Sequence, residues 1–222
     1  MSEAAGPVFR PERHPIVRAM QACCAVYGRC WHRITLRNPV PLPRHGPAIL
    51  VCNHVSGLDP ILIQSVCPRI IRWMMAREYF DLRRLQWIYS TVGAIPVRRG
   101  QRDTAATRAA LRALEGGNIV GVFPEGMIET TRELLPFQPG IGLLAAKSGA
   151  PVYPVYLEGS QRGKEMVPAF LSHNSASLRF GRPLEMSRGD GYERADAFAL
   201  RVQNAVECLR RAEYAARGDK NY

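Results

Sequence analysis

Apolar runs bounded by polar and turn-forming residues recur along most of the chain, and the segments between them have helical spacing. Such runs predict buried strands, here over residues 48–52, 70–76, 94–98, 118–123 and 152–157, with a shorter strand at 177–180. Apolar side chains three or four positions apart predict helices over 60–66, 78–90, 102–114 and 141–147, and a closing helix from Ala195 to Leu209. Strands alternating with helices indicate a layered α/β domain with a mostly parallel sheet flanked by helices.

Proline residues set two of the boundaries. Asp59 followed by Pro60 is typical of a helix start, with the aspartate as N-cap and the proline at the first helical position. Pro96 interrupts the apolar run at 94–98. Because proline cannot donate a hydrogen bond to a neighbouring strand, we expect this strand at an edge or at its own end.

The N-terminal segment, residues 1–37, is predicted to hold an amphipathic helix. Residues 1–14 are rich in proline and charge and are expected to be loose. From Pro15 onward, helical spacing separates an apolar face from a polar face: Ile16, Met20, Cys23, Tyr27, Trp31 and Ile34 against Arg18, Gln21, Arg29 and His32. Such a helix suits a membrane interface, and packing on the protein's own core is the alternative. No stretch approaches the roughly 20 apolar residues of a spanning helix, so none is predicted.

Composition indicates a folded protein and narrows its partners. The chain has 222 residues, of which 46% are hydrophobic and 22% charged, enough for one domain, assigned to residues 38–222. Lysine and arginine exceed aspartate and glutamate by 30 to 19, giving a formal net charge of +11. This excess favours anionic partners such as nucleic acid, acidic lipid headgroups or phosphorylated small molecules. Aromatic residues are not interleaved with the arginines as in RNA-binding motifs, so we expect no nucleic-acid partner.

The cysteines give no sign of a metal centre. None of the six forms a Cys-x-x-Cys pair, and no cysteine–histidine group has the spacing of zinc ligands. The sequence therefore predicts neither a bound metal nor a disulfide framework, as in a protein that faces a reducing compartment.

A histidine and an aspartate follow the first strong strand. His54 and Asp59 lie on the loop between the strand at 48–52 and the next helix, where site residues of α/β folds often lie. An imidazole oriented by a carboxylate is a general base that works near neutral pH. Taken alone, the pair is better read as a turn histidine and a capping aspartate.

Three further stretches end or continue predicted strands. Gly93 to Arg98 puts a guanidinium group just beyond a strand, where an anion could bind. Phe123-Pro124-Glu125-Gly126 places a carboxylate on a tight turn whose glycine permits close backbone approach. Val152 to Val155 is apolar and could be core. Each stretch is generic by itself.

Together and in this order, the four stretches resemble the glycerolipid acyltransferase family, which includes the 1-acylglycerol-3-phosphate acyltransferases. The family's N-H-x-x-x-x-D block is matched from Asn53 to Asp59, and its F-P-E-G block from Phe123 to Gly126. Gly93 to Arg98 is similar to its second block, with a glycine, an isoleucine and an arginine, and Val152 to Val155 to its fourth. The resemblance spans about residues 48 to 157 and is expected to extend to 180.

The resemblance implies an enzyme of phospholipid biosynthesis. Members transfer a fatty acyl group from a coenzyme A or acyl-carrier-protein thioester to a lipid hydroxyl, here most closely that of 1-acylglycerol-3-phosphate. On this pattern His54 takes the proton of the acceptor hydroxyl and Asp59 orients the imidazole. The hydroxyl is itself the nucleophile, so no acyl-enzyme is needed. The family works without a metal ion or a cofactor beyond the acyl donor.

The same resemblance implies the substrate-binding residues. Arg98 is expected to bind an acceptor phosphate, and Glu125 and Gly126 to shape the acceptor site. Asn53, Phe123 and Pro124 are carried over from the same blocks as further substrate-binding residues. The N-terminal segment is expected to lie against an anionic membrane surface, which makes the protein a peripheral membrane protein of the cytoplasmic face.

This chain departs from the family after the F-P-E-G block. Many relatives continue with threonine and arginine, and that arginine helps to hold phosphate, whereas this chain has Met127 and Ile128. Arg99 or Arg132 are candidates to replace it. The alternatives are another lyso-lipid acceptor, such as a lyso-ornithine lipid, or a non-catalytic basic module that binds membranes.

Overall fold

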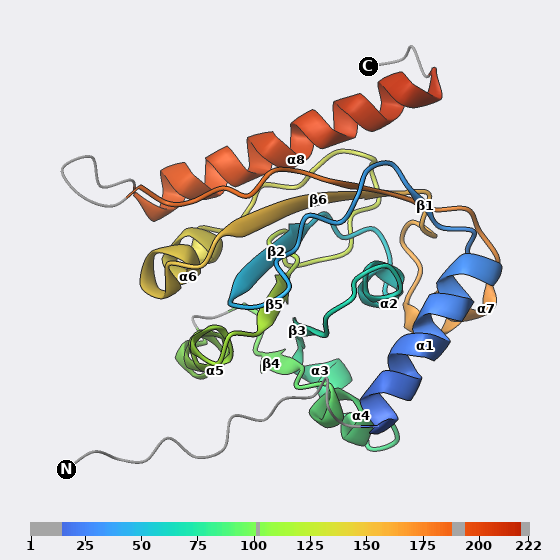
Figure 1. Ribbon diagram of the computed structural model, residues 1–222, viewed down its shortest axis with the longest axis horizontal. Coiled ribbons are helices and arrows are strands. Elements are labelled where there is room, and N and C mark those ends of the chain that lie inside the picture. Colours follow the sequence, from blue (N-terminus) through green and yellow to red (C-terminus); the bar gives the residue numbers. More distant parts are fainter. Residues whose placement is uncertain (1–14, 101–102, 188–193, 219–222) are drawn as a thin grey trace.

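The computed structural model describes residues 15–100, 103–187 and 194–218, and its strands form one seven-stranded sheet (Figure 1). In chain order the elements are α1 (Pro15–Cys30), β1 (Thr35–Leu36), β2 (Ala48–Cys52), α2 (Asp59–Gln64), β3 (Ile71–Ala76), α3 (Arg77–Phe80), α4 (Gln86–Thr91), β4 (Ile95–Val97), α5 (Thr104–Glu115), β5 (Ile119–Val122), α6 (Gly140–Ser148), β6 (Val152–Glu158), α7 (Met166–Leu171), β7 (Ser177–Phe180) and α8 (Ala195–Arg217). The expectations for residues 1–14 and for Arg102 lie outside the described residues.

The sheet is mostly parallel, as the sequence predicts. Its strand order is β1-β7-β6-β2-β5-β3-β4, and the five neighbours from β6 to β4 all run in the same direction. Only the β6–β7 pairing is antiparallel within the described strands, and β1 then runs parallel to β7. The strand that contains Pro96 is β4, at the edge of the sheet, which confirms that expectation. The carboxyl ends of β2, β5, β3 and β4 therefore lie side by side along one end of the sheet.

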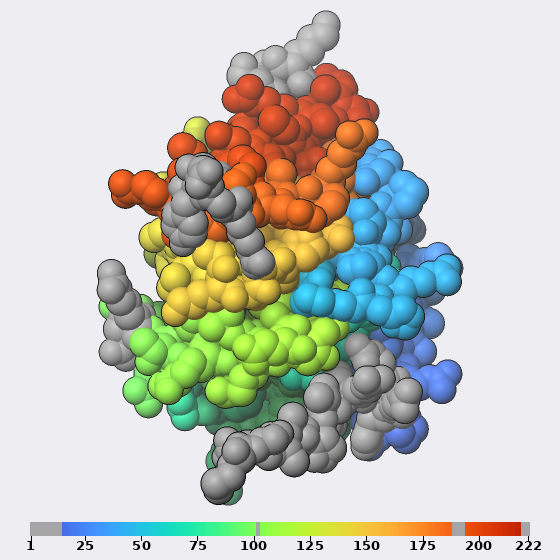
Figure 2. Space-filling view, turned by 60° about the vertical axis from the view of Figure 1, so that its left-hand side comes forward, coloured from blue at the N-terminus to red at the C-terminus, as the bar shows by residue number. Residues whose placement is uncertain are grey.

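Helices cover both faces of this sheet, and β2 shows why. All five of its residues are buried, because alternate side chains of a central strand enter two different cores. Ile49 and Val51 pack with residues of α5, α6 and α8. Leu50 and Cys52 pack on the other face with residues of α2 and α7. Figure 2 shows α8 in red as a ridge above the yellow and green parts of the chain.

The predicted single helix over 78–90 is wrong, because the chain forms two short helices, α3 and α4, joined by a turn. The rings of Phe80 and Tyr89 stack with their centroids 6.2 Å apart. In one straight helix, residues nine positions apart lie on opposite faces and about 13 Å apart along the axis. The turn brings these two rings together, so a packing contact decides against the continuous helix.

Helix α1 confirms the predicted amphipathic segment only in part. The helix ends at Cys30 and does not reach Ile34, because the chain turns at Arg33, whose φ is 40°. Its buried residues are Val17 and Gly28, whereas Ile16 on the predicted apolar face is exposed. A Cβ at Gly28 would lie 2.4 Å from Ser65 Oγ, so α1 crosses close to the end of α2 at this point.

His32, placed on the polar face by the sequence, is fully buried. Its ring bonds to the Tyr27 hydroxyl through Nε2, at 2.8 Å, and to the Asn174 side chain through Nδ1. Burial lowers the pKa of His32 from its ordinary value. The residue therefore ties the end of α1 to the segment that follows α7. No helix among the described segments has both the length and the apolar character needed to cross a membrane.

Candidate active site

The loop from Asn53 to Leu58 joins the carboxyl end of β2 to α2. Asp59 is the first residue of this helix, and the N-cap is Leu58, so the expectation of an aspartate cap is off by one residue. The carboxylate of Asp59 turns back onto its own loop. Its Oδ2 accepts hydrogen bonds from the backbone nitrogens of Val55, at 2.7 Å, and Ser56, at 2.9 Å. The loop is thereby wrapped around the carboxylate.

The same carboxylate meets the imidazole that the sequence pairs with it. His54 Nδ1 lies 3.0 Å from Asp59 Oδ2, the side chain of Asp59 is fully buried, and the imidazole is 15% exposed. A buried carboxylate requires hydrogen-bond donors. Since the Nδ1 proton serves Asp59, Nε2 is the ring nitrogen left to accept a proton from another group.

The loop after β6 closes a further side of the site, and sequence reasoning missed it. Ser160 Oγ donates to the other carboxylate oxygen, Asp59 Oδ1, at 2.7 Å. Gly163 N donates to Val55 O at 2.8 Å, and Gly57 N donates to Lys164 O at 2.9 Å. The apolar block of β6 directly precedes this loop, but nothing in the sequence indicates that Ser160 reaches a residue 101 positions away.

The Phe123–Gly126 turn lies against His54 on the neighbouring strand end, that of β5. The rings of Phe123 and His54 stack at a centroid distance of 4.1 Å. Gly126 has φ +75°, and a Cβ there would lie 2.4 Å from Gln138 Nε2, so this turn requires glycine. The predicted role of Gly126 in shaping the acceptor site stays a prediction.

Glu125 is buried beneath the histidine loop. Its Oε1 accepts from the backbone nitrogen of His54 at 3.2 Å, and its Oε2 accepts from Leu135 N at 3.4 Å. Burial raises the pKa of the Glu125 carboxyl to about 7. These two contacts hold the main chain of the site, and the predicted contact of Glu125 with the acceptor stays a prediction.

A row of aromatic rings extends from His54 across the strand ends. Trp73 of β3 stacks on Phe123 at a centroid distance of 4.7 Å, and Phe123 stacks in turn on His54. A Cβ at Gly121 of β5 would lie 2.4 Å from the Trp73 ring, so only glycine leaves room for the indole. The sequence shows Trp73 as one apolar residue among others in its strand, and its place behind the site was missed.

A second carboxylate supports the loop from the other side. Glu129 is buried and donates its backbone N–H to His54 O at 2.7 Å. Its carboxylate accepts bonds from the Arg162 guanidinium and from the backbone nitrogen of Arg132. Burial lowers the pKa of Arg162 from its ordinary value. Arg162 and Glu129 thus join the loop after β6 to the segment that follows the Phe123–Gly126 turn.

The three arginines proposed as phosphate ligands come from two parts of the chain, the end of β4 and the segment after the Phe123–Gly126 turn. Arg98 follows β4 and is exposed, and β5 and β3 lie between β4 and β2. Three strand spacings of about 4.8 Å put its backbone roughly 14 Å from the end of β2. The Arg99 guanidinium lies 5.8 Å from the centre of the Tyr79 ring. Arg132, whose φ is 70°, bonds to Glu129 through its main chain.

Two residues carried over as substrate-binding groups make structural contacts. Asn53 is buried, and its amide donates to Leu157 O and accepts from Leu157 N, both at 2.9 Å. It therefore ties the end of β2 to β6. Pro124 is buried, and its carbonyl accepts from Gln138 N at 3.0 Å. Their predicted contacts with a substrate stay predictions.

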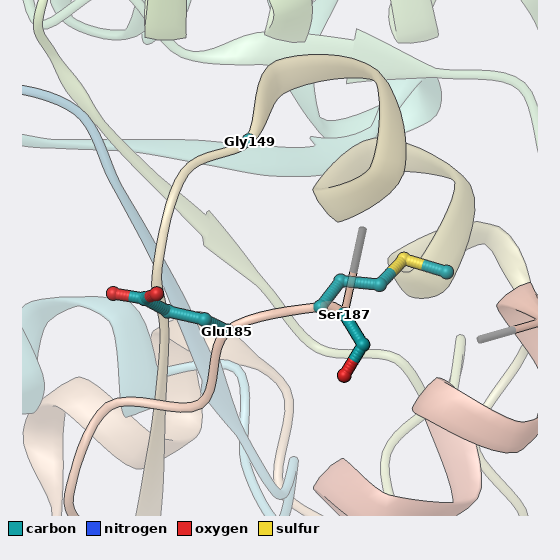
Figure 3. Close-up of a pocket in the computed structure, with 4 residues that line it drawn as sticks. Gly149, Glu185 and Ser187 are labelled. Atoms are coloured by element: carbon teal, nitrogen blue, oxygen red, sulfur yellow. The ribbon is translucent and has the colours of Figure 1, made fainter. Parts of the chain in front are cut away.

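A surface hollow elsewhere does not belong to this site. It is lined by Gly149, Glu185, Met186 and Ser187, and the Glu185 and Ser187 side chains point apart in it (Figure 3). Gly149 lies just before β6, at the amino end of a strand parallel to β2, whereas His54 follows the carboxyl end of β2. The hollow is therefore at the amino ends of these strands, and His54 is at their carboxyl ends. Across the described ranges, no three histidine, cysteine, aspartate or glutamate side chains are grouped as metal ligands.

Comparisons with known proteins show which family the sequence is similar to. The profile of the family described as Acyltransferase matches residues 33–158, more than half of the chain. A 1-acyl-sn-glycerol-3-phosphate acyltransferase of Bacillus subtilis is 26% identical over 155 residues, which cover 69% of this chain and 75% of the relative. A chloroplastic 1-acyl-sn-glycerol-3-phosphate acyltransferase of Arabidopsis thaliana is 26% identical over 82% of this chain, which spans only 51% of that relative.

The fold is similar to that of a solved structure. The crystal structure of the 1-acyl-sn-glycerophosphate (LPA) acyltransferase PlsC from Thermotoga maritima superposes with a TM-score of 0.67 at 18% identity. The similarity covers 91% of this chain and 85% of that protein. At this identity the likeness concerns the fold alone.

Proposed function

The chain belongs to the acyltransferase family, and on that premise we propose that it transfers a fatty acyl group from a thioester donor to the hydroxyl of a lysophospholipid. The first candidate acceptor is 1-acylglycerol-3-phosphate, because the relatives from Bacillus subtilis and Arabidopsis thaliana are named for that substrate. The observation that carries the proposal is the 3.0 Å contact between His54 Nδ1 and Asp59 Oδ2. This contact leaves Nε2 as a base at the carboxyl ends of the parallel strands.

The chemistry follows from this contact. Nε2 of His54 removes the proton of the acceptor hydroxyl while the oxygen attacks the thioester carbonyl carbon. The new carbon–oxygen bond forms and the carbon–sulfur bond breaks, and the leaving thiolate recovers the proton from the imidazolium. General-base help of this kind is worth about 100- to 10,000-fold. No covalent intermediate on the protein is required.

Asp59 acts by position and charge. Its two oxygens accept bonds from His54, Val55, Ser56 and Ser160, so the carboxylate is held in place before the substrate binds. Its negative charge beside Nδ1 stabilises the imidazolium as it forms.

A lyso-lipid without a phosphate is the second candidate acceptor. Met127 and Ile128 follow the Phe123–Gly126 turn, and Met127 is exposed. A phosphate near this turn would lack the guanidinium that many relatives place there, and Arg162, on the loop after β6, already bonds to Glu129. A lyso-lipid without a phosphate, such as a lyso-ornithine lipid, would not need that contact.

Membrane association is part of the proposal. The acceptor is a lipid, the net charge is +11, and α1 exposes the apolar side chains Ile16 and Val26 beside the exposed arginines 18 and 29. Basic charge beside exposed apolar side chains favours an anionic lipid surface. The protein would then act as a peripheral membrane enzyme, with coenzyme A or an acyl-carrier protein carrying the donor chain.

One assay tests the proposed activity and separates the acceptors. The purified protein is offered an acyl-coenzyme A or an acyl-carrier-protein thioester with lysophosphatidate, other lysophospholipids or a lyso-ornithine lipid, and the product is identified by mass. We expect an ester on the free hydroxyl of lysophosphatidate. Turnover confined to lyso-ornithine lipid would support the second acceptor class. No acylated product from any pair would contradict acyl transfer.

A further inference from the structure

Helix α7 exposes apolar side chains to an unusual degree for its length. Of its six residues, Val167 is 66% exposed and Leu171 is 70% exposed, and Phe170 is also exposed. Only Ala169 is buried. Isolated exposed apolar residues are ordinary on protein surfaces, but a contiguous group of them indicates an interaction site.

Helix α1 lies beside α7 and extends this apolar surface (Figure 1). The rings of Tyr27 and Phe170 stack with centroids 4.5 Å apart, and the Trp31 ring meets that of His173 at 5.8 Å. Helix α1 contributes its own exposed apolar side chains, among them Val26, which is 62% exposed. We name the resulting group the α1–α7 surface: Val26, Trp31, Val167, Phe170 and Leu171.

The charges around the α1–α7 surface determine what can cover it. Residues 15–37 contain four arginines and no acidic residue. Arg37 is paired with Glu213, whereas Arg18, Arg29 and Arg33 are exposed. Lys164, just before α7, is exposed as well, and the carboxylate of the neighbouring Glu165 accepts a hydrogen bond from the Tyr79 hydroxyl at 2.6 Å. An apolar surface bordered by cations is complementary to a bilayer with anionic headgroups, because the side chains enter the acyl boundary while the cations remain at headgroup level.

This surface is continuous with the site. A Cβ at Gly57, inside the His54–Asp59 loop, would lie 2.5 Å from the backbone nitrogen of Met166, the first residue of α7. Gly57 also donates its N–H to Lys164 O at 2.9 Å. Helix α7 therefore begins against the loop that carries the proposed base. A bilayer held by α7 would be next to that loop.

From these contacts we propose that α7, together with α1, docks the protein on an anionic phospholipid bilayer and so sets the His54–Asp59 loop at the lipid surface. The inference rests on the proposed function, but docking on a bilayer can be measured without acyl transfer. It differs from the expectation drawn from the sequence, which assigns membrane contact to residues 1–37 alone. Helix α7 lies far along the chain and supplies the more exposed part of the apolar surface.

The test is binding to sedimented vesicles. The double variant Val167→Ser/Leu171→Ser is compared with the wild type on vesicles of equimolar phosphatidylglycerol and phosphatidylcholine, and on phosphatidylcholine alone. Leu200→Ser is the matched control, because Leu200 is 57% exposed on α8, which packs on the other face of the sheet. All three side chains are largely exposed, so their replacement should leave the thermal unfolding midpoint unchanged.

We expect the partition coefficient of the double variant on anionic vesicles to fall at least about tenfold, because two large apolar side chains no longer enter the bilayer. The Leu200 control should bind as the wild type does, and wild-type binding should weaken on phosphatidylcholine alone. Turnover of a short-chain acceptor, dissolved below its critical micelle concentration, should be the same in all three proteins. This last readout separates docking from catalysis, and vesicle binding stays measurable even if the wild type has no acyltransferase activity.

Equal partitioning of the wild type and the double variant would overturn the proposal. If the double variant then also lost mass by light scattering, the α1–α7 surface would be assigned to a second copy of the chain.

Discussion

Ser160 donates its hydroxyl to Asp59 Oδ1 at 2.7 Å, while His54 Nδ1 contacts the other oxygen, Oδ2, at 3.0 Å. Each oxygen of this buried carboxylate is therefore fixed by a different part of the chain. The hydroxyl comes from the loop after β6, and the imidazole from the loop after β2. The orientation of the proposed base thus depends on a residue outside the motif that contains it.

Replacing Ser160 with alanine should lower kcat without a matching change in KM. The change removes one of the donors that hold Asp59 and leaves Oδ1 without that partner, and a hydrogen bond to a charged group is worth about 1.5–3 kcal/mol. Because other donors remain, we expect a fall of about tenfold in kcat. Steady-state kinetics on a soluble acceptor measure it.

Ser160→Thr is the matched control for this change, because it keeps the hydroxyl. It should retain most of the activity. Equal loss of kcat in the alanine and threonine variants would show that the loop shape matters and not the bond to Asp59.

Glu125 should make the stability of the protein depend on pH. Burial raises the pKa of its carboxyl to about 7 from the ordinary 4.5. Because the folded-state pKa is raised, this contribution to stability is fully present below about pH 4.5 and is lost as the pH rises through 7. The difference between 4.5 and 7 corresponds to up to about 3 kcal/mol.

The measurement is denaturant unfolding of the wild type and Glu125→Gln between pH 4.5 and 8.5. The glutamine variant should lose less stability than the wild type across this range, because its side chain does not ionise. Parallel curves for the two proteins would contradict a raised pKa at this carboxyl.

Trp73 should be required for the aromatic row behind the site. Trp73→Ala removes a buried indole stacked on Phe123, and large-to-small changes of this kind cost about 3–5 kcal/mol of unfolding free energy. Trp73→Phe keeps a stacked ring and should lose less stability and retain more turnover. Thermal unfolding and kcat are the readouts, and equal activity of the alanine variant and the wild type would exclude a role for the row in positioning His54.

Arg98 tests how the acceptor phosphate is held. If its guanidinium binds that phosphate, Arg98→Ala should raise the KM for lysophosphatidate about ten- to a hundredfold and leave the KM for an acceptor without phosphate unchanged. Arg108→Ala, an exposed arginine on α5, is the control. An unchanged KM for lysophosphatidate would assign the phosphate to another cation.

The sequence predicts well the parts of the fold that local patterns determine. Long apolar runs such as 48–52 and 152–157 become the central strands β2 and β6, because a strand buried on both faces needs apolar residues at every position. Strand β1 has only two residues and no pattern of its own, since it forms by pairing with β7. Helix α7 was missed because its apolar residues face outward, and a helix of six residues gives too few turns for periodicity.

The residues of the site also divide into those that local motifs predict and those that only the fold brings together. His54, Asp59 and Glu125 could be found because short motifs contain them, and the structure places His54 against both carboxyl-bearing residues. Ser160 and Arg162 lie on a loop without a motif, and their partners are 101 and 33 positions away. Such contacts depend on the strand order, which brings β6 beside β2 and cannot be read from the spacing of residues.

The most direct test of the account is the turnover number of His54→Ala. The purified variant, with an unchanged thermal unfolding midpoint, should transfer acyl groups to lysophosphatidate at least about a hundredfold more slowly than the wild type. His45→Ala, an exposed histidine in the loop before β2, should be as active as the wild type. If His54→Ala turned over at the wild-type rate, the general base would have to lie elsewhere and the proposed mechanism would be wrong.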